Sequence, residues 1–139
     1  REKARILGIQ RHVISVGVVQ PQRAPDFYEG ADAMLLPSVL ECFSANYPEA
    51  MKMGVPIVTT DLPFARSVCG DAALYYSPRN AESAAAAIET LYRDISFAQS
   101  LVSKGAERIR EFPTPREKAR RYIEICEALY EKRRRGQTP

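Results

Sequence analysis

Cysteine is scarce in this chain of 139 residues, with one residue each at positions 42, 69 and 126. The three are widely spaced, and no two of them form a CxxC pair. An odd number of isolated cysteines argues against a disulfide framework and against a zinc site. We therefore expect reduced thiols in a cytoplasmic protein, and we expect no metal ion or other cofactor.

Long apolar runs are also missing. No stretch approaches the roughly 18 apolar residues that a membrane-spanning helix needs. The chain begins with REKAR rather than with an apolar leader, so nothing in it argues for secretion. These two absences favour a protein that stays on the cytoplasmic side of the membrane.

A large excess of charge of one sign is absent as well. Twenty Lys and Arg residues face 17 Asp and Glu residues, a net charge of +3, which is too small to indicate a nucleic-acid partner. The basic residues gather near the C-terminus, in REKARR (116–121) and KRRR (132–135). This pattern favours a solvated helix face; weak association with the inner membrane surface is the alternative. His12, the one histidine, is assigned a structural role.

Short β-like runs alternate with helical stretches through the first half of the chain. Apolar or β-branched residues predict four strands, at 12–19, 33–37, 55–60 and 73–77. Such alternation is typical of a doubly wound parallel sheet, and a complete domain of that kind has about five or six strands. We therefore expect an incomplete Rossmann-like α/β domain with C-terminal helices. Its open sheet edge suggests pairing with a second copy.

Helical patterns fill the gaps between the strands and dominate after residue 80. Helices are expected at 1–9 (the end of one), 25–31, 49–54, 80–94, 96–112 and from 115 onward. Asn80 and Ser96 are the expected N-caps of two of them. Thr114 and Glu117 form a capping-box pattern around Pro115.

The last of these helices, in the expected closing segment 113–139, carries an apolar stripe at helical spacing. Its members are Ala119, Tyr122, Ile123, Cys126 and Leu129. Spacings of three, four and seven residues predict one apolar helix face. We interpret this face as core packing, followed by a basic tail.

The stretch ECFSANYPEA (41–50) joins a predicted strand to a predicted helix that begins near Tyr47. Free N–H groups and the dipole at a helix N-terminus favour a phosphate, and the side chains of Ser44 and Asn46 can add donors. Carboxylates such as Glu41 and Glu49 suit vicinal hydroxyls. A phosphate between two sets of hydroxyls is the outline of a nucleotide-sugar. Alternatively, Asn46 and Glu49 form a capping box.

The wider pattern around this loop resembles a known family. Glu41 and Glu49 are separated by seven residues, EAMKMGVPIVTTD (49–61) follows, and Gly-Asp-Ala (70–72) precedes another strand. These features are similar to the donor-binding half of retaining glycosyltransferases with the GT-B fold, the large family 4 group. The resemblance covers essentially the whole chain. It implies a donor-binding domain of a nucleotide-sugar-dependent glycosyltransferase.

The resemblance also implies roles for individual residues. Glu41 would be the catalytic-site residue that contacts donor sugar hydroxyls near the reacting carbon, and Glu49 would hold the ribose hydroxyls. Ser38 would border the base. Cys42 stands where the family has glycine. The remaining donor-binding residues, which would face the sugar and diphosphate, are Cys42, Phe43, Ser44, Ala45 and Asn46.

Other parts of the family pattern have no counterpart in these 139 residues. The family has an upstream Gly-rich turn, an Arg/Lys pair on the donor diphosphate and an acceptor-binding domain. We therefore expect the full-length parent to be the enzyme and this chain alone to be inactive. The acceptor would be a sugar, a lipid-linked glycan or a polysaccharide. The alternative function is a non-catalytic Rossmann-like module that self-associates or completes its sheet with a partner.

Overall fold

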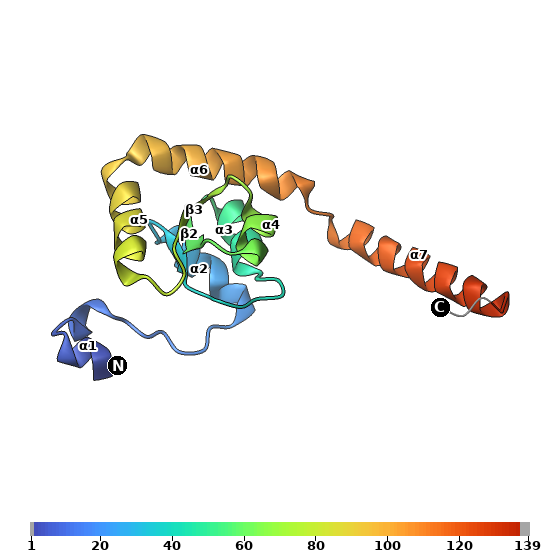
Figure 1. Cartoon of the computed structure of the whole chain (residues 1–139), viewed down its shortest axis with the longest axis horizontal. Coiled ribbons are helices and arrows are strands. Elements are labelled where there is room, and N and C mark those ends of the chain that lie inside the picture. Colours follow the sequence, from blue (N-terminus) through green and yellow to red (C-terminus); the bar gives the residue numbers. More distant parts are fainter. Residues whose placement is uncertain (1, 137–139) are drawn as a thin grey trace.

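The computed structural model, which describes residues 2–136, contains a three-stranded parallel sheet surrounded by helices (Figure 1). The strands are β1 (Met34–Leu36), β2 (Ile57–Thr60) and β3 (Ala73–Tyr76), in the spatial order β1-β2-β3. Both pairs are parallel, so the carboxyl ends of all three strands meet at one edge of the sheet. The parallel α/β architecture is the one that the alternating pattern predicted.

Strand β2 is the centre of the sheet, and all four of its residues are buried. Successive side chains point to opposite faces, so Ile57 belongs to one apolar cluster and Val58 to another. The first cluster includes residues of helices α3 (Asn46–Met53) and α4 (Pro63–Cys69). The second includes residues of α5 (Ala81–Arg93) and α6 (Ile95–Arg108). A sheet covered on both faces explains why its strands are continuous apolar runs.

Helix α6 also packs on α3, through the close approach of Gly105 and Met51. A Cβ atom added at Gly105 would lie 3.2 Å from the Met51 Cγ atom. The missing side chain therefore lets the two helices lie closer than most residues would allow. This contact is one of several that hold α3 and the loop that precedes it.

Several helix ends follow their local sequence, but the N-cap of α6 does not. Asn80 caps α5, accepting a hydrogen bond from the Ser83 N–H group, and α3 ends at Gly54 with φ of 69°. The cap of α6 is Asp94, which accepts from the Phe97 N–H group at 2.8 Å, so the prediction of Ser96 was wrong. Helix α4 was not expected, because its seven residues hold too short an apolar pattern.

The prediction of a strand at 12–19 was wrong. This region holds the 3-10 turn η1 (Gln10–His12) and then an irregular, exposed segment in which Val18 is 99% exposed. A strand needs a neighbour for its N–H and C=O groups, and no strand within residues 2–136 pairs with this one. High β-propensity alone did not form a strand. The expected helix before it is confirmed as α1 (Glu2–Ile6).

The segment between 21 and 29 contains the 3-10 turn η2 (Pro21–Arg23) and helix α2 (Ala24–Glu29), which matches the predicted short helix. Another 3-10 turn, η3 (Ile109–Glu111), extends α6 and packs near α3.

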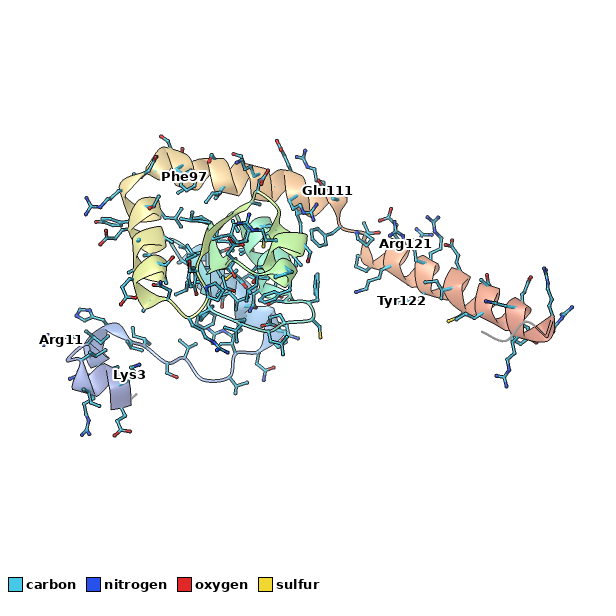
Figure 2. All side chains as sticks on the ribbon, viewed as in Figure 1. Lys3, Arg11, Phe97, Glu111, Arg121 and Tyr122 are labelled. Atoms are coloured by element: carbon cyan, nitrogen blue, oxygen red, sulfur yellow. The ribbon has the colours of Figure 1, made fainter. Side chains whose placement is uncertain are left out.

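Helix α7 (Pro115–Arg134) projects away from the rest of the molecule (Figure 1). Its N-terminus has the predicted capping box of Thr114 and Glu117. None of its residues is buried, so the interpretation of its apolar stripe as core packing was wrong for this chain. Figure 2 shows Arg121 and Tyr122 among side chains that extend from α7 into solvent. A stripe specifies a face but not the surface that covers it.

No helix between residues 2 and 136 is both long enough and apolar enough to cross a membrane.

Candidate functional site

The loop 37–45 leaves the carboxyl end of β1 and enters α3. Two threonines of the neighbouring strand hold its beginning. The Thr59 Oγ1 hydroxyl donates to the Leu36 carbonyl at 3.0 Å, and the Thr60 Oγ1 hydroxyl donates to the Ser38 carbonyl at 2.6 Å. Strand β2 therefore sets the direction in which the loop leaves the sheet.

Glu41 is half-buried in this loop. Its Oε1 atom accepts a hydrogen bond of 2.9 Å from the Ser38 hydroxyl. Because Thr60 holds the Ser38 carbonyl, a chain of two hydrogen bonds joins Glu41 to the centre of the sheet. The structure thus brings together two predicted site residues, Ser38 and Glu41.

Glu49 lies in the first turn of α3, and its side chain is exposed. Its Oε2 atom accepts a hydrogen bond of 3.2 Å from the hydroxyl of Tyr28, a residue of α2. Burial, followed by the nearby Glu49 carboxylate, raises the pKa of Tyr28 to about 12. The Tyr28 hydroxyl is therefore protonated at neutral pH and can only donate to the carboxylate.

The alternative interpretation of Asn46 and Glu49 as a capping box was wrong. Asn46 is already inside α3, the N-cap position belongs to Ala45, and no side chain caps this helix. A capping glutamate would turn back toward the N-cap N–H group, whereas Glu49 turns toward α2. The carboxylate is consequently available to a ligand on its other oxygen.

The residues between the two glutamates line the entrance to α3. Cys42 and Phe43 are exposed, and the Phe43 ring lies 6.5 Å from the Phe112 ring, centroid to centroid. Ser44 is buried, and its carbonyl accepts from the Tyr47 N–H group. Within the described part of the chain, the backbone N–H groups of residues 42–46 donate no hydrogen bond to protein. They form a run of free donors at the positive end of a helix dipole.

A pair of hydroxyls anchors α3 beneath this loop. Tyr47, which has no exposed surface, lies with its hydroxyl 2.8 Å from the Thr59 Oγ1 atom. Because the Thr59 proton goes to the Leu36 carbonyl, the Tyr47 hydroxyl is the donor of the pair. Burial raises the pKa of Tyr47. The two hydrogen bonds join β1, β2 and the first turn of α3 into one unit.

A charged pair lies just beyond the carboxyl end of β2. The Arg66 guanidinium donates to both carboxylate oxygens of Asp61, at 2.6 and 2.8 Å, and lies 4.0 Å from the Tyr75 ring centre. Hydrogen bonding from Arg66 lowers the pKa of Asp61. Arg66 is thus bound by its own neighbour rather than directed toward the loop.

Sequence reasoning missed four residues that shape this site: Tyr28, Tyr47, Thr59 and Thr60. For the threonines a signal was present, because two polar residues end the apolar run VPIVTT (55–60) and mark the carboxyl end of a strand. Nothing in the local sequence links Tyr28 to Glu49, which lies 21 residues further along the chain.

The sequence is similar to that of known glycosyltransferases. Residues 1–94 match the family described as glycosyl transferases group 1. The chain is 29% identical over 97 residues to O-antigen chain mannosyltransferase B of Escherichia coli, covering 70% of this chain and 26% of that protein. It is 25% identical over 107 residues to an uncharacterized glycosyltransferase of Methanocaldococcus jannaschii, covering 76% and 27%. The chain therefore spans about a quarter of the length of these curated relatives.

Solved structures give the fold. Sucrose-phosphate synthase from Thermosynechococcus elongatus matches with a TM-score of 0.84 and 21% identity, over 94% of this chain and 33% of that one. Anabaena HepE in complex with UDP matches with 0.76 and 21%, over 94% and 35%. The C-terminal domain of a Francisella tularensis group 1 glycosyl transferase, LpcC, matches with 0.68 and 18%, over 78% and 57%. The fold is therefore that of a partial Rossmann-like domain of GT-B type.

Proposed function

Because the chain belongs to the group 1 glycosyl transferases, we propose that it is the donor-binding part of a longer enzyme. That enzyme transfers a sugar from a nucleotide-sugar to an acceptor, with retention of the anomeric configuration, as family 4 glycosyltransferases do. The proposal includes no metal ion or other cofactor.

One observation carries the proposal: two glutamates flank a run of free N–H groups at the start of α3. Glu41 and Glu49 each accept one hydroxyl hydrogen bond from protein and retain further acceptor positions. The N–H groups of residues 42–46 have no protein acceptor within the described part of the chain. This arrangement suits a ligand with a diphosphate in the middle and hydroxyls at both ends.

In this proposal each residue of the loop has a defined task. Glu41 accepts hydrogen bonds from the donor sugar, and Glu49 accepts them from the ribose. The backbone from Cys42 to Ala45 donates to the sugar and the diphosphate, and the Asn46 side chain adds a donor. Ser38 borders the base and orients Glu41 through its 2.9 Å hydrogen bond.

The names of two similar proteins support this class of ligand. Anabaena HepE is described in complex with UDP, and the Escherichia coli relative is named a mannosyltransferase. Both descriptions agree with a nucleotide-sugar donor for this chain. A panel of nucleotide-sugars identifies the base and the sugar.

Catalysis in this proposal belongs to the full-length parent, a cytoplasmic enzyme. Transfer requires an acceptor hydroxyl held near the reacting carbon and a stabilised diphosphate leaving group. The acceptor is a sugar, a lipid-linked glycan or a polysaccharide, and these 139 residues alone are inactive. The basic residues of α7 contribute weak attraction to an anionic membrane surface.

The experiment is a ligand-detected NMR titration of the chain with UDP-, GDP- and ADP-sugars. We expect weak binding of one nucleotide class, and a loss of about tenfold or more in affinity in Glu49→Ala, because hydrogen bonds to a charged group are lost. Glu82→Ala is the matched control, since Glu82 also lies exposed in the first turn of a helix. Unchanged affinity in Glu49→Ala would contradict the ribose role.

The second candidate function is a non-catalytic module that self-associates. It is favoured by the open edge of β1, where Leu35 is exposed, and by the exposed apolar residues of the unpaired segment at 13–19. Strand edges of this kind pair with other chains. Light scattering across a concentration series tests the idea, and a sharp monomer at the highest concentration would exclude it.

A further inference from the structure

Tyr28 is held by packing and by one hydrogen bond within the chain. It belongs to α2, whose first turn contains Pro25, and its ring packs against the apolar cluster that contains Tyr47 and Ala50 of α3. The ring is half-buried, while the hydroxyl reaches the Glu49 Oε2 atom at 3.2 Å. A rigid aromatic side chain thus presents one donor to the carboxylate.

Glu49, in contrast, has little of its own to hold it. Its side chain is exposed at the start of α3 and makes no capping hydrogen bond. An exposed glutamate samples several rotamers, and ordering them on binding costs free energy. The hydrogen bond from Tyr28 selects one orientation before the ligand binds.

The geometry leaves room for a diol. An ionised carboxylate has about four lone-pair positions on its two oxygens, and Tyr28 uses one of them, on Oε2. Because burial raises the pKa of Tyr28 to about 12, its hydroxyl keeps the proton that it donates to the carboxylate. Oε1 and the second position on Oε2 remain for two adjacent hydroxyls.

We propose that Tyr28 is a positioning residue that orients Glu49 toward the ribose diol and thereby sets the preference for ribonucleotides over 2′-deoxyribonucleotides. The inference rests on the proposed function, in which Glu49 holds the ribose. Tyr28 itself touches Glu49 rather than the ligand. Its effect on binding therefore depends on the presence of the Glu49 carboxylate.

The test is a double-mutant cycle on this chain with Tyr28→Phe, Glu49→Gln and the double variant. The phenylalanine ring keeps the packing and removes only the hydroxyl. The probes are UDP, GDP and ADP and their 2′-deoxy counterparts, with affinity measured by ligand-detected NMR. The nucleotide that binds the unaltered chain is carried through the cycle.

We expect Tyr28→Phe to weaken binding of the ribonucleotide about three- to tenfold and to leave the 2′-deoxynucleotide nearly unchanged. In the Glu49→Gln background, Tyr28→Phe should have much less effect, because coupled residues give non-additive changes. Tyr92→Phe is the control, since Tyr92 is an exposed tyrosine of α5, and it should change neither affinity.

The outcomes separate the inference from the proposed function. Binding by the unaltered chain with an equal ribose preference in Tyr28→Phe overturns the inference and leaves the proposed function intact. A lower melting temperature in Tyr28→Phe with the same preference identifies Tyr28 as a packing residue only. Equal affinity of the unaltered chain for ribo- and deoxyribonucleotides also overturns the inference. Failure of the unaltered chain to bind any nucleotide overturns both.

Discussion

Helices α6 and α7 follow each other in the chain and begin alike, yet they have opposite environments. Each is capped by a side chain, Asp94 for α6 and Thr114 for α7, and each carries apolar residues at helical spacing. Helix α6 buries Leu101 and Gly105, whereas α7 buries nothing. Capping residues and apolar spacing thus determine where a helix begins and which of its faces is apolar. Whether that face is buried depends on whether another part of the protein packs against it.

The two helices are consequently stabilised by different forces. Helix α6 gains from apolar surface removed from water and from its contact with α3. Helix α7 relies on its capping box and on exposed ion pairs such as Arg120 with Glu124, at 3.6 Å. Such pairs contribute only a few tenths of a kcal/mol each. Loss of α7 should therefore leave the rest of the fold intact.

The largest expected difference between the two helices comes from matched leucine truncations. Leu101 of α6 is 3% exposed and Leu129 of α7 is 60% exposed. We expect Leu101→Ala to lower the free energy of unfolding by about 2 to 5 kcal/mol and Leu129→Ala to change it by less than about 0.5 kcal/mol. Urea denaturation followed by circular dichroism measures both. Equal losses would mean that α7 is packed in solution.

The next largest expected difference is in the reactivity of two cysteines, Cys69 in α4 and Cys126 in α7. Cys69 is fully buried in α4, and burial raises the pKa of its thiol to about 12, while Cys126 of α7 is exposed. Alkylation needs the thiolate, so iodoacetamide at pH 8 should modify Cys126 roughly a hundredfold faster. Peptide mass mapping follows each site, and denatured protein serves as the control. Similar rates in the native chain would contradict the buried position of Cys69.

The smallest expected effect is a pH dependence at the start of α7. Hydrogen bonds from the Thr114 backbone N–H group and then its side chain lower the pKa of Glu117. A lowered pKa means that the cap stabilises the helix at pH values above the usual glutamate pKa, and that this stabilisation is lost as the pH falls below that value. NMR secondary shifts of residues 115–118 should report this fraying.

Helix α5 supplies the control for the pH measurement, because its cap, Asn80, does not titrate. Its first turn should keep its secondary shifts over the same pH range. Fraying of both helix ends together would point to general acid unfolding rather than to the capping box.

Prediction from sequence succeeded wherever the controlling interactions are local or follow from a continuous apolar run. The strands β1, β2 and β3 and the helices α5, α6 and α7 lie where their patterns indicated. The predicted strand at 12–19 did not form because a strand needs a neighbouring strand to hydrogen-bond with, and no strand of the described chain pairs with that segment. The interpretation of the α7 stripe as core packing was wrong for a related reason, because no part of the described chain packs against it.

The candidate site likewise has features that the sequence predicted and features that only the structure shows. A strand, a short loop and a helix could be read from the chain, and that order places Glu41 and Glu49 at the carboxyl edge of the sheet. The partners of these glutamates could only partly be anticipated. Ser38 is three residues from Glu41, whereas Tyr28 is 21 residues from Glu49. A contact between residues that far apart cannot be predicted from the sequence around either of them.

By itself, the sequence determined the parallel α/β class, most helix boundaries and the family to which the chain belongs, because these depend on periodicity, caps and motif spacing. Tertiary structure alone decided that Tyr28 donates to Glu49, that Thr60 holds the loop at Ser38 and that the α7 stripe stays exposed. The physical reason is that hydrogen-bond partners and burial require two surfaces to meet. Each stretch of sequence describes only one of them.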